Sequence, residues 1–196
     1  CMMKDGYQLL EDFDGQFRGY EICSVRQRDA LPIMRWRNAQ IDALRQSEPL
    51  SEEGQLAYFQ EVIFPSFSLE QPPMIILSFL HDGKLIGYGG IVHLNWEDKR
   101  GEVSFLLDPD RTKDKQSYGQ EFGTFLSLLK RLAFRHLGLN RLTTEAYGNR
   151  PWHVQAIEAN GFHSEGILRQ HVTKDDQFVD AHLHACLRKD FEKDEC

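Results

Sequence analysis

The stretch from Leu106 to Glu121 joins a strand end, a basic polar loop and the start of a helix. Arg111, Lys113 and Lys115 place positive charge in this loop, and Gly119 lies at the predicted beginning of the helix. Free backbone N–H groups and the positive end of the helix dipole meet at such a junction, which suits a phosphate group. The residues therefore predict a pyrophosphate site; the alternative is a solvated surface loop before an ordinary helix.

A second group of polar side chains lies on the last predicted hairpin, which turns at residues 175–176. A two-residue turn pairs Thr173 with Phe178, and strict alternation then places four polar residues on one exposed face: His171, Asp180, His182 and His184. The opposite face, from Val179 to Leu187, is expected to be buried. Imidazoles at i and i+2 with a cross-strand partner have the spacing of a metal site. Because no closed ligand set accompanies them, we expect ordinary polar-face residues and no functional metal.

Hydrophobic periodicity predicts the elements that must hold the loop in place. Strands are expected at residues 20–25, 74–80, 85–94, 102–107 and 141–147, and in a final hairpin after residue 162. Helices are expected within residues 29–46, from Ser51 as N-cap to Pro65, at 119–136 with Gly138 as C-terminal cap, and at 152–159. This order predicts an α/β fold with a mixed central sheet and flanking helices.

The length of 196 residues suits one globular domain. We expect residues 1–19 to form an N-terminal arm or short hairpin, residues 20–191 the domain, and residues 192–196 a C-terminal tail. The formal net charge of −7 argues against nucleic acid and an anionic membrane surface as partners, because phosphate binding normally needs clustered Lys and Arg. The cysteines are few and scattered, with no disulfide framework, which favours a cytoplasmic location.

Two motifs resemble those of the GNAT acetyltransferases. Gln116-Ser117-Tyr118-Gly119-Gln120-Glu121 matches the first and fourth positions of the family's Q/R-x-x-G-x-G/A acyl-CoA loop, with Glu121 where the family has a small residue. The segment from Glu158 to Arg169, which contains Gly161-Phe162 and Glu165-Gly166, resembles the family's E-K-x-G-F-x-x-E-G-x-x-R. The resemblance implies a GNAT-like sheet whose two middle strands splay apart.

An upstream motif, Arg35-Trp36-Arg37-Asn38, resembles a subgroup that contains amino-sugar N-acetyltransferases and ribosomal-protein N-terminal acetyltransferases. The subgroup implies an acetyl-CoA-dependent N-acetyltransferase whose acceptor is a small primary amine, with an amino sugar or a nucleotide-linked amino sugar favoured. The substrate-binding residues that it implies are Trp36, Arg37, His93 and Ser104. Protein N-terminal acetylation and a non-catalytic CoA-binding module are the alternatives. A homodimer is the oligomer that we consider for this chain, whichever function it has.

The family resemblance also implies where acetyl-CoA, the co-substrate, binds. Its diphosphate is expected at the helix start, and its pantetheine arm between the strands at residues 105–107 and 142–145. The cofactor-binding residues implied in this way are Phe105, Leu106, Leu107, Gln116, Ser117, Tyr118, Gly119, Gln120, Glu121 and Asn149.

Acetyl transfer to an amine needs a neutral nitrogen, a hydrogen-bond donor for the thioester oxygen and an acceptor for the proton. Glu102 and Glu145 are the two carboxylates that the resemblance directs toward this region, although either could be a solvated charge at a strand end. The resemblance favours Glu102 as the base, because the family often places a water-coupled carboxylate on the strand that also binds pantetheine. Period-two alternation places Glu102, Ser104 and Leu106 on one face of that strand, where the carboxylate and the hydroxyl could share a water. The amide of Leu106 or Leu107 is the expected oxyanion donor.

The position of the leaving-group acid departs from the family pattern. Many members have a tyrosine there that protonates the thiolate, whereas this chain has Ile157. Tyr147 and Tyr118 are the possible substitutes. Alternatively, a thiolate whose conjugate acid has a pKa near about 8.5 can leave without a dedicated acid.

Overall fold

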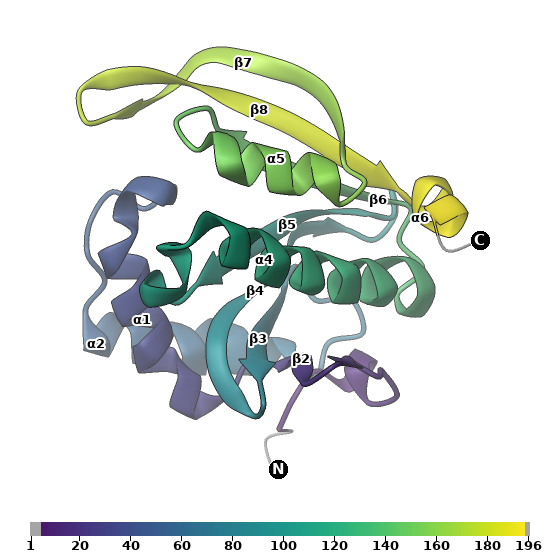
Figure 1. Ribbon diagram of the computed structural model, residues 1–196. Coiled ribbons are helices and arrows are strands. Elements are labelled where there is room, and N and C mark those ends of the chain that lie inside the picture. The colour runs from purple at the N-terminus through teal and green to yellow at the C-terminus, as the bar shows by residue number, and fades with distance from the viewer. Residues whose placement is uncertain (1–4, 195–196) are drawn as a thin grey trace.

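One mixed sheet forms the centre of the computed structural model, which describes residues 5–194 (Figure 1). Its eight strands are ordered β1-β2-β3-β4-β5-β6-β8-β7, and the predicted α/β class is confirmed. The strands are β1 (Gln16–Phe17), β2 (Tyr20–Ser24), β3 (Ile75–His81), β4 (Lys84–Asn95), β5 (Arg100–Leu107), β6 (Arg141–Tyr147), β7 (His163–Lys174) and β8 (Gln177–Leu187). The helices are α1 (Ala30–Ala39), α2 (Glu52–Tyr58), α3 (Phe64–Ser66), α4 (Lys115–Lys130), α5 (Pro151–Ala159) and α6 (Arg188–Asp194).

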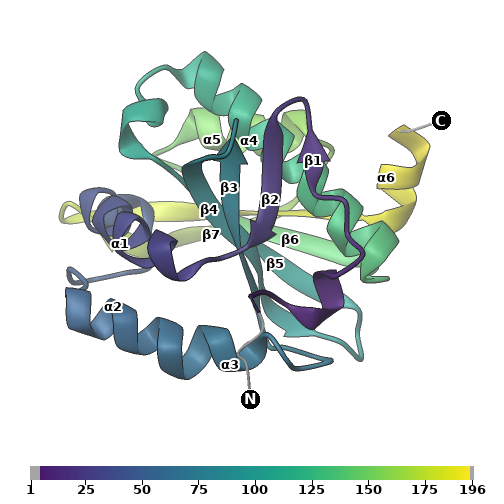
Figure 2. The same cartoon turned by 90° about the horizontal axis from the view of Figure 1, so that it is seen from below.

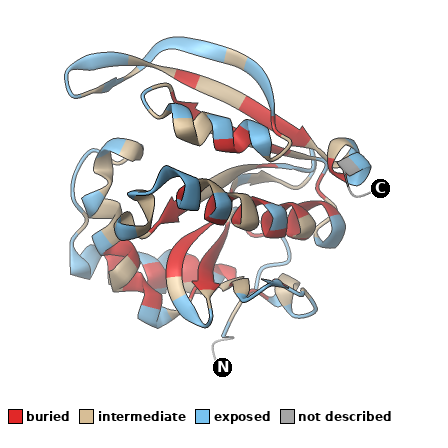
Figure 3. Ribbon diagram, viewed as in Figure 1, coloured by how far each residue is buried: buried red, intermediate tan, exposed pale blue. Residues whose placement is uncertain are grey.

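Helices cover both faces of the sheet (Figure 2). On the α4 face, the ring of Phe105 in β5 lies 4.6 Å from that of Phe122 and 4.7 Å from that of Phe125. On the other face, Arg37 of α1 reaches Tyr88 of β4. Because they are covered on both sides, β3 is buried along most of its length and β4 is buried over residues 86–91 (Figure 3). This explains why both strands have nearly continuous apolar or glycine sequences.

The centre of the sheet is split. β5 and β6 are parallel partners from Arg100↔Arg141 to Glu102↔Thr143. Beyond these pairs, β5 bonds only to β4 and β6 only to β8 among the described strands. The two middle strands therefore splay apart, as the resemblance implies, and each presents an open backbone edge to the other.

The helix α4 begins at Lys115 rather than at Gly119. Asp114 is its N-cap, because the side chain accepts hydrogen bonds from the N–H groups of Gln116 and Ser117. A capping carboxylate starts a helix before its apolar periodicity becomes evident. The predicted phosphate loop after Asp114 is therefore the first part of the helix.

The helix that follows Ser51 begins as predicted and ends slightly later. The Ser51 side chain accepts a hydrogen bond from the N–H of Gly54, which makes it the N-cap of α2. Pro65 does not end the helical segment. It lies one residue before the end of a continuous helical segment, which runs from α2 through a π-helical stretch (Phe59–Ile63) into α3 and ends at Ser66.

The β7–β8 hairpin has the predicted register only beside its turn. Thr173 pairs with Phe178 as predicted. An irregularity between Leu168 and Val172 then shifts the pairing, so that Ile167 faces His182 rather than His184.

Gln170 explains this irregularity. Its backbone has a φ of 51°, and its N–H donates to Asp180 Oδ1 at 2.7 Å. The predicted exposed face is wrong for His184, which is only 1% exposed because α5 packs over this part of β8. Its Nε2 lies 3.1 Å from Glu158 Oε1 on α5.

Both ends of the described chain pack against the sheet. The Tyr7 side chain is buried, and its hydroxyl accepts a hydrogen bond from the N–H of Ile76 at 2.9 Å. β1 and β2 are joined at Arg18-Gly19, and α6 follows β8 directly. The predicted arm and tail also include residues 1–4 and 195–196, which lie outside the described residues. Within residues 5–194, every helix is too short or too polar to cross a membrane.

Candidate active site

A cavity of about 620 Å³ opens where β5 and β6 separate. Residues 102–105 of β5 and residues 144–147 of β6 form two of its walls. The segment 43–50, which follows α1, forms a third wall, and α5 contributes His153 and Ile157. Side chains from elements far apart in the sequence therefore meet at the split in the sheet.

The open edge of β5 presents the backbone of every second residue to this cavity. The N–H of Asp108 donates to Ile86 O at 2.8 Å and so points toward β4. Alternation directs the Leu106 amide to β4 as well, which makes it unsuitable as an oxyanion donor. The amides of Val103, Phe105 and Leu107 point to the open side. At the wide end of the split, Gln40 Nε2 already donates to Leu107 O at 2.8 Å.

The edge of β6 follows the same rule. The N–H of Gly148 donates to Asp180 O, so the backbones of Glu145 and Tyr147 face the split. The side chain of Thr144 points to the face of the sheet opposite to that of Glu145. Its Oγ1 is buried there and has no hydrogen-bond partner among the described residues. Thr144 also lines the cavity. A buried hydroxyl without a partner is unfavourable, so a polar ligand group at this point would stabilise the structure.

Arg45 joins the two carboxylates predicted to be catalytic. Its Nη2 lies 2.8 Å from Glu102 Oε1 and 3.0 Å from Glu145 Oε2. His93 Nδ1 lies 3.0 Å from Glu102 Oε2. Burial lowers the pKa of Arg45, but the two carboxylates raise it by more, so the pKa lies above its ordinary value. No local motif marks Arg45, since it lies in an irregular segment and only the fold brings it to the strands.

The start of α4 is occupied by its own cap. Asp114 accepts from the N–H of Gln116 at 3.3 Å and from the N–H of Ser117 at 3.1 Å. The Ser117 hydroxyl donates to the same carboxylate at 2.5 Å. These hydrogen bonds, first that of the hydroxyl, hold the pKa of Asp114 below its ordinary value. Asp114 is thus an anion in the position where a diphosphate was expected.

The remaining predicted amide donors lie further inside α4. The N–H of Tyr118 donates to Asp114 O at 3.0 Å. The amides of Gly119 and Gln120 come later in the helix, where each N–H bonds to the carbonyl four residues before it. Direct contact of a phosphate with these three amides is therefore unsupported by the geometry. A Cβ added at Gly119 would meet no atom within 4 Å, so the space beside the helix start is open.

Glu121 is a further correction to the predicted phosphate site. Its side chain is buried, and its carboxylate accepts hydrogen bonds from Arg111, whose Nε lies 3.0 Å from Glu121 Oε2. The hydrogen bond and charge of Glu121 hold the pKa of Arg111 above its ordinary value. This ion pair anchors the loop to α4, and neither member is directed to a phosphate.

Tyr118 and His153 form a buried polar pair beside the cavity. The Tyr118 hydroxyl lies 2.7 Å from His153 Nδ1, and Arg150 Nη2 donates to the same hydroxyl at 3.4 Å. Burial raises the pKa of Tyr118 to about 12, and burial, with the charge of Arg150, lowers the pKa of His153 to about 3. At neutral pH a protonated phenol therefore donates to a neutral imidazole. His153 lies one helical turn before Ile157, so helical spacing was a signal that could have identified it.

Tyr147 and Asn149 lie at the end of β6. Tyr147 lines the cavity, and burial followed by the charge of Glu145 raises the pKa of its hydroxyl. Asn149 is exposed in the turn between β6 and α5. The structure brings Tyr147 to the cavity with Glu102 and Glu145, while Asn149 lies beyond its wall.

A second cavity, of about 440 Å³, lies between β4 and helices α1 and α2. Arg37, Arg45, Tyr88, Val92 and Ser104 line both cavities, which connects the two spaces. Three of the predicted substrate residues meet there: Arg37, His93 and Ser104. The fourth, Trp36, packs against the hydrophobic core.

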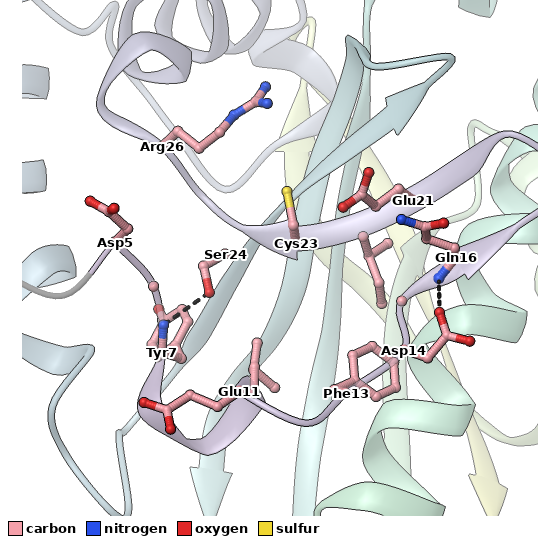
Figure 4. Close-up of a pocket in the computed structure, with 14 residues that line it drawn as sticks. Asp5, Tyr7, Glu11, Phe13, Asp14, Gln16, Glu21, Cys23, Ser24 and Arg26 are labelled. Atoms are coloured by element: carbon pink, nitrogen blue, oxygen red, sulfur yellow. Dashed lines mark hydrogen bonds between the residues drawn. The ribbon is translucent and has the colours of Figure 1, made fainter.

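A third cavity, of about 560 Å³, lies between β2 and the N-terminal segment (Figure 4). Its lining includes Cys23 and four carboxylates: Asp5, Glu11, Asp14 and Glu21. Burial raises the pKa of the Cys23 thiol to about 11, so it is not a nucleophilic thiolate at neutral pH. β3 and β4 separate this cavity from β5, and it does not take part in the acid–base cluster.

Comparisons with known proteins agree with the split sheet. A family model described as an acetyltransferase (GNAT) domain matches residues 22–183. Spermidine N-acetyltransferase from Vibrio cholerae, solved with CoA and spermine, has a TM-score of 0.77 at 15% identity over 90% of this chain and 99% of that chain. A dodecameric structure of spermidine N-acetyltransferase from the same organism has a TM-score of 0.73 at 16% identity, over 89% and 97% of the two chains. At such identities the similarity concerns the fold alone.

Proposed function

The chain belongs to the GNAT acetyltransferase family, and from this premise we propose that it transfers the acetyl group of acetyl-CoA to the primary amine of a small acceptor. The observation that carries the proposal is the separation of β5 and β6 next to Glu102. It combines an open channel with a proton acceptor at the closed end of that channel.

The residues of the split fit acetyl-CoA. Val103 and Phe105 offer unpaired backbone groups on one side, and Glu145 does so on the other, which suits the extended amide chain of pantetheine. Thr144 Oγ1 supplies a further polar group that needs a partner. At the start of α4, the Asp114 side chain must turn away before a diphosphate can use the helix N-terminus. When bound, acetyl-CoA supplies the thioester carbonyl that the amine attacks.

Glu102 is the proposed proton acceptor. Its two carboxylate oxygens contact Arg45 and His93, which hold the side chain at the end of the split. The acceptor enters as an ammonium ion and must lose a proton before its nitrogen can attack. Amides on the open edge of β5 next to Glu102, those of Val103 and Phe105, are the proposed oxyanion donors.

Tyr147 is the proposed proton donor for the leaving group. Its hydroxyl remains protonated at neutral pH because burial and the charge of Glu145 raise its pKa. Tyr118 is less suitable, since its hydroxyl is already bonded to His153 and the side chain is buried under α5.

The acceptor class is part of the same proposal. An amino sugar or nucleotide-linked amino sugar is our first candidate, on the resemblance of residues 35–38. The structures of similar fold are named for spermidine, so a polyamine is the second candidate. Cysteine usage supports a cytoplasmic location.

A thiol-release assay tests the proposal directly. Acetyl-CoA is incubated with the protein and a panel of amines that includes glucosamine and spermidine, and free CoA is measured. We expect release that depends on the amine and saturates with it. If acetyl-CoA binds and no amine causes CoA release, the chain is instead a CoA-binding module without catalysis.

A further inference from the structure

The second cavity, between β4 and helices α1 and α2, contains a cation whose charge is not matched. Arg37 Nε donates to Gln46 Oε1 at 3.0 Å, and its Nη1 donates to Tyr88 OH at 3.3 Å. Both partners are neutral, and within residues 5–194 no carboxylate forms an ion pair with Arg37. Its side chain is half-buried, so the charge is also incompletely hydrated. A half-buried guanidinium with spare donors is a favourable partner for an anion.

The rest of this cavity makes the charge distribution one-sided. None of the described residues that line it is Asp or Glu, whereas the first cavity, which Arg37 also lines, has Glu48, Glu102 and Glu145 in its walls. Arg45, the other arginine of the second cavity, already forms ion pairs with Glu102 and Glu145. Most of the remaining wall is apolar or aromatic, including Phe59 and Met74. The cavity therefore suits a ligand that is mostly apolar and has a negatively charged group near Arg37.

Resting on the proposed function, we infer that the acceptor is an amine that also has an anionic group, a carboxylate or a phosphate, which Arg37 binds. Within the second cavity a polyamine is disfavoured, because a second ammonium group beside Arg37 would meet no Asp or Glu of that lining. Arg37 is thus a residue that determines acceptor specificity.

The strand register limits the spacing of the two acceptor groups. Tyr88, which contacts Arg37, pairs with Leu106, whereas Glu102 pairs with Val92. Both pairs lie on one face of the sheet, four residues apart, which corresponds to roughly 13 Å along the strand. We therefore expect an acceptor whose anion and amine are several bonds apart. An amino sugar phosphate or an ω-amino acid has such a spacing, whereas an α-amino acid does not.

Matched pairs of amines test the inference. Glucosamine 6-phosphate is compared with glucosamine, and 6-aminohexanoate with hexylamine, so that each pair differs by one anionic group. Spermidine is the polyamine probe. The wild-type protein is expected to have a higher kcat/KM for the anionic member, and the pair that shows the larger ratio identifies phosphate or carboxylate as the preferred group.

The variant Arg37→Gln supplies the second measurement. It should reduce the kcat/KM ratio of anionic to neutral amine by roughly 10- to 100-fold, the usual size of a charged hydrogen bond. Arg35→Gln is the matched control, because Arg35 is exposed on the same helix and should leave the ratio unchanged. The melting temperature and the acetyl-CoA Kd report whether either variant disturbs the fold.

The outcomes separate this inference from the proposed function. If no amine releases CoA, the acetyltransferase proposal itself is wrong. If spermidine, hexylamine and glucosamine are acetylated as efficiently as the anionic amines, and Arg37→Gln leaves the ratios unchanged, the function stands and the role of Arg37 is rejected. A ratio that falls in Arg37→Gln and not in Arg35→Gln supports the inference.

Discussion

At the scale of single residues, Glu102 occupies the last residue pair before β5 and β6 separate. Its contacts with Arg45 and His93 restrict the side chain on both oxygens. Glu145 shares Arg45 but lies on the other strand, beyond the point of separation. The two carboxylates therefore share one cation, Arg45, but lie at different positions along the split. Substitution of Glu102 and of Glu145 should consequently change kcat to different extents.

Replacing Glu102 by Gln should lower kcat by about 10²–10⁴-fold, the usual contribution of a general base, while the Kd of acetyl-CoA stays nearly constant. The deficit relative to the wild type should shrink as pH rises through the pKa of the acceptor amine, because a neutral amine needs no base. Steady-state rates at several pH values measure both effects. Glu145→Gln is the control, since it also removes a partner of Arg45. An unchanged kcat in Glu102→Gln at neutral pH would exclude Glu102 as the base.

His153 links the site to the pH dependence of stability. Its pKa falls from 6.5 to about 3 on folding, because burial and the charge of Arg150 disfavour the imidazolium. Tyr118, Arg150 and His184 are the titratable or charged groups that face it. Between about pH 3 and pH 6.5 the unfolded state binds one more proton at this residue than the folded state does. The contribution of His153 to the free energy of unfolding is therefore complete above pH 6.5 and is lost as the pH falls toward 3.

His153→Gln should therefore flatten the dependence of unfolding free energy on pH. The Gln carbonyl can still accept the hydrogen bond of Tyr118, so packing changes little. The difference in slope between wild type and variant should approach ~1.4 kcal/mol per pH unit in this window. Urea unfolding at pH 4, 5, 6 and 7 measures it, with His171→Gln on the exposed strand β7 as control. Parallel curves for wild type and His153→Gln would contradict the assignment.

At the scale of secondary structure, the N-terminus of α4 has two competing uses. Asp114 caps the helix through the amides of Gln116 and Ser117. A bound diphosphate needs amides at the same helix end, and its charge is repelled by the capping carboxylate. The N-terminus of α4 is therefore stabilised by Asp114 without a ligand, and the Asp114 carboxylate lowers the affinity of this helix end for an anion.

Asp114→Asn should keep the cap and remove the charge, since Asn is as good an N-cap as Asp. The affinity for CoA is then expected to rise by roughly 2- to 5-fold, the size of one charge near a helix end. Isothermal titration at low salt measures the Kd. Asp98→Asn, in the turn between β4 and β5, makes the same change in net charge away from the helix and should have no effect. A larger Kd for CoA in Asp114→Asn than in the wild type would indicate that Asp114 helps to bind CoA.

At the scale of the whole molecule, the sheet consists of two parts, strands β1 to β5 and strands β6, β8 and β7, which meet along a short parallel contact. Side chains add further connections across the split. Arg45 bonds to both parts, and Lys174 near the hairpin turn donates to Leu44 O at 2.6 Å. A ligand that lies in the split contacts both parts at once and stabilises their folded arrangement.

Saturating acetyl-CoA should consequently raise the melting temperature. At a concentration of about 100 times Kd the gain is ~2.7 kcal/mol, which corresponds to roughly 5–10 °C for a domain of this size. Differential scanning fluorimetry measures it, and ATP at equal concentration controls for general nucleotide binding. An unchanged melting curve with acetyl-CoA would contradict the proposed site.

Local patterns in the sequence determined most elements of this fold. The strand at residues 141–147 was predicted with its observed ends, and Ser51 was identified as a helix cap, because alternation and capping depend on neighbouring residues. The apolar periodicity of α4 was also evident, although its first turn was missed because Asp114, rather than an apolar residue, starts the helix. The resemblance at residues 116–121 and 158–169 led to the family.

Only the tertiary structure decided how these elements combine into a site. The bulge at Gln170 depends on a hydrogen bond to Asp180 across the hairpin, and His184 is buried by the packing of α5 on β8. The contact of Arg45 with Glu102 joins residues 57 positions apart, and that segment has no regular pattern. Periodicity reports which face of an element is buried, since burial repeats along the chain. It does not report which distant charges meet, because such pairs form only after the backbone has brought their elements together.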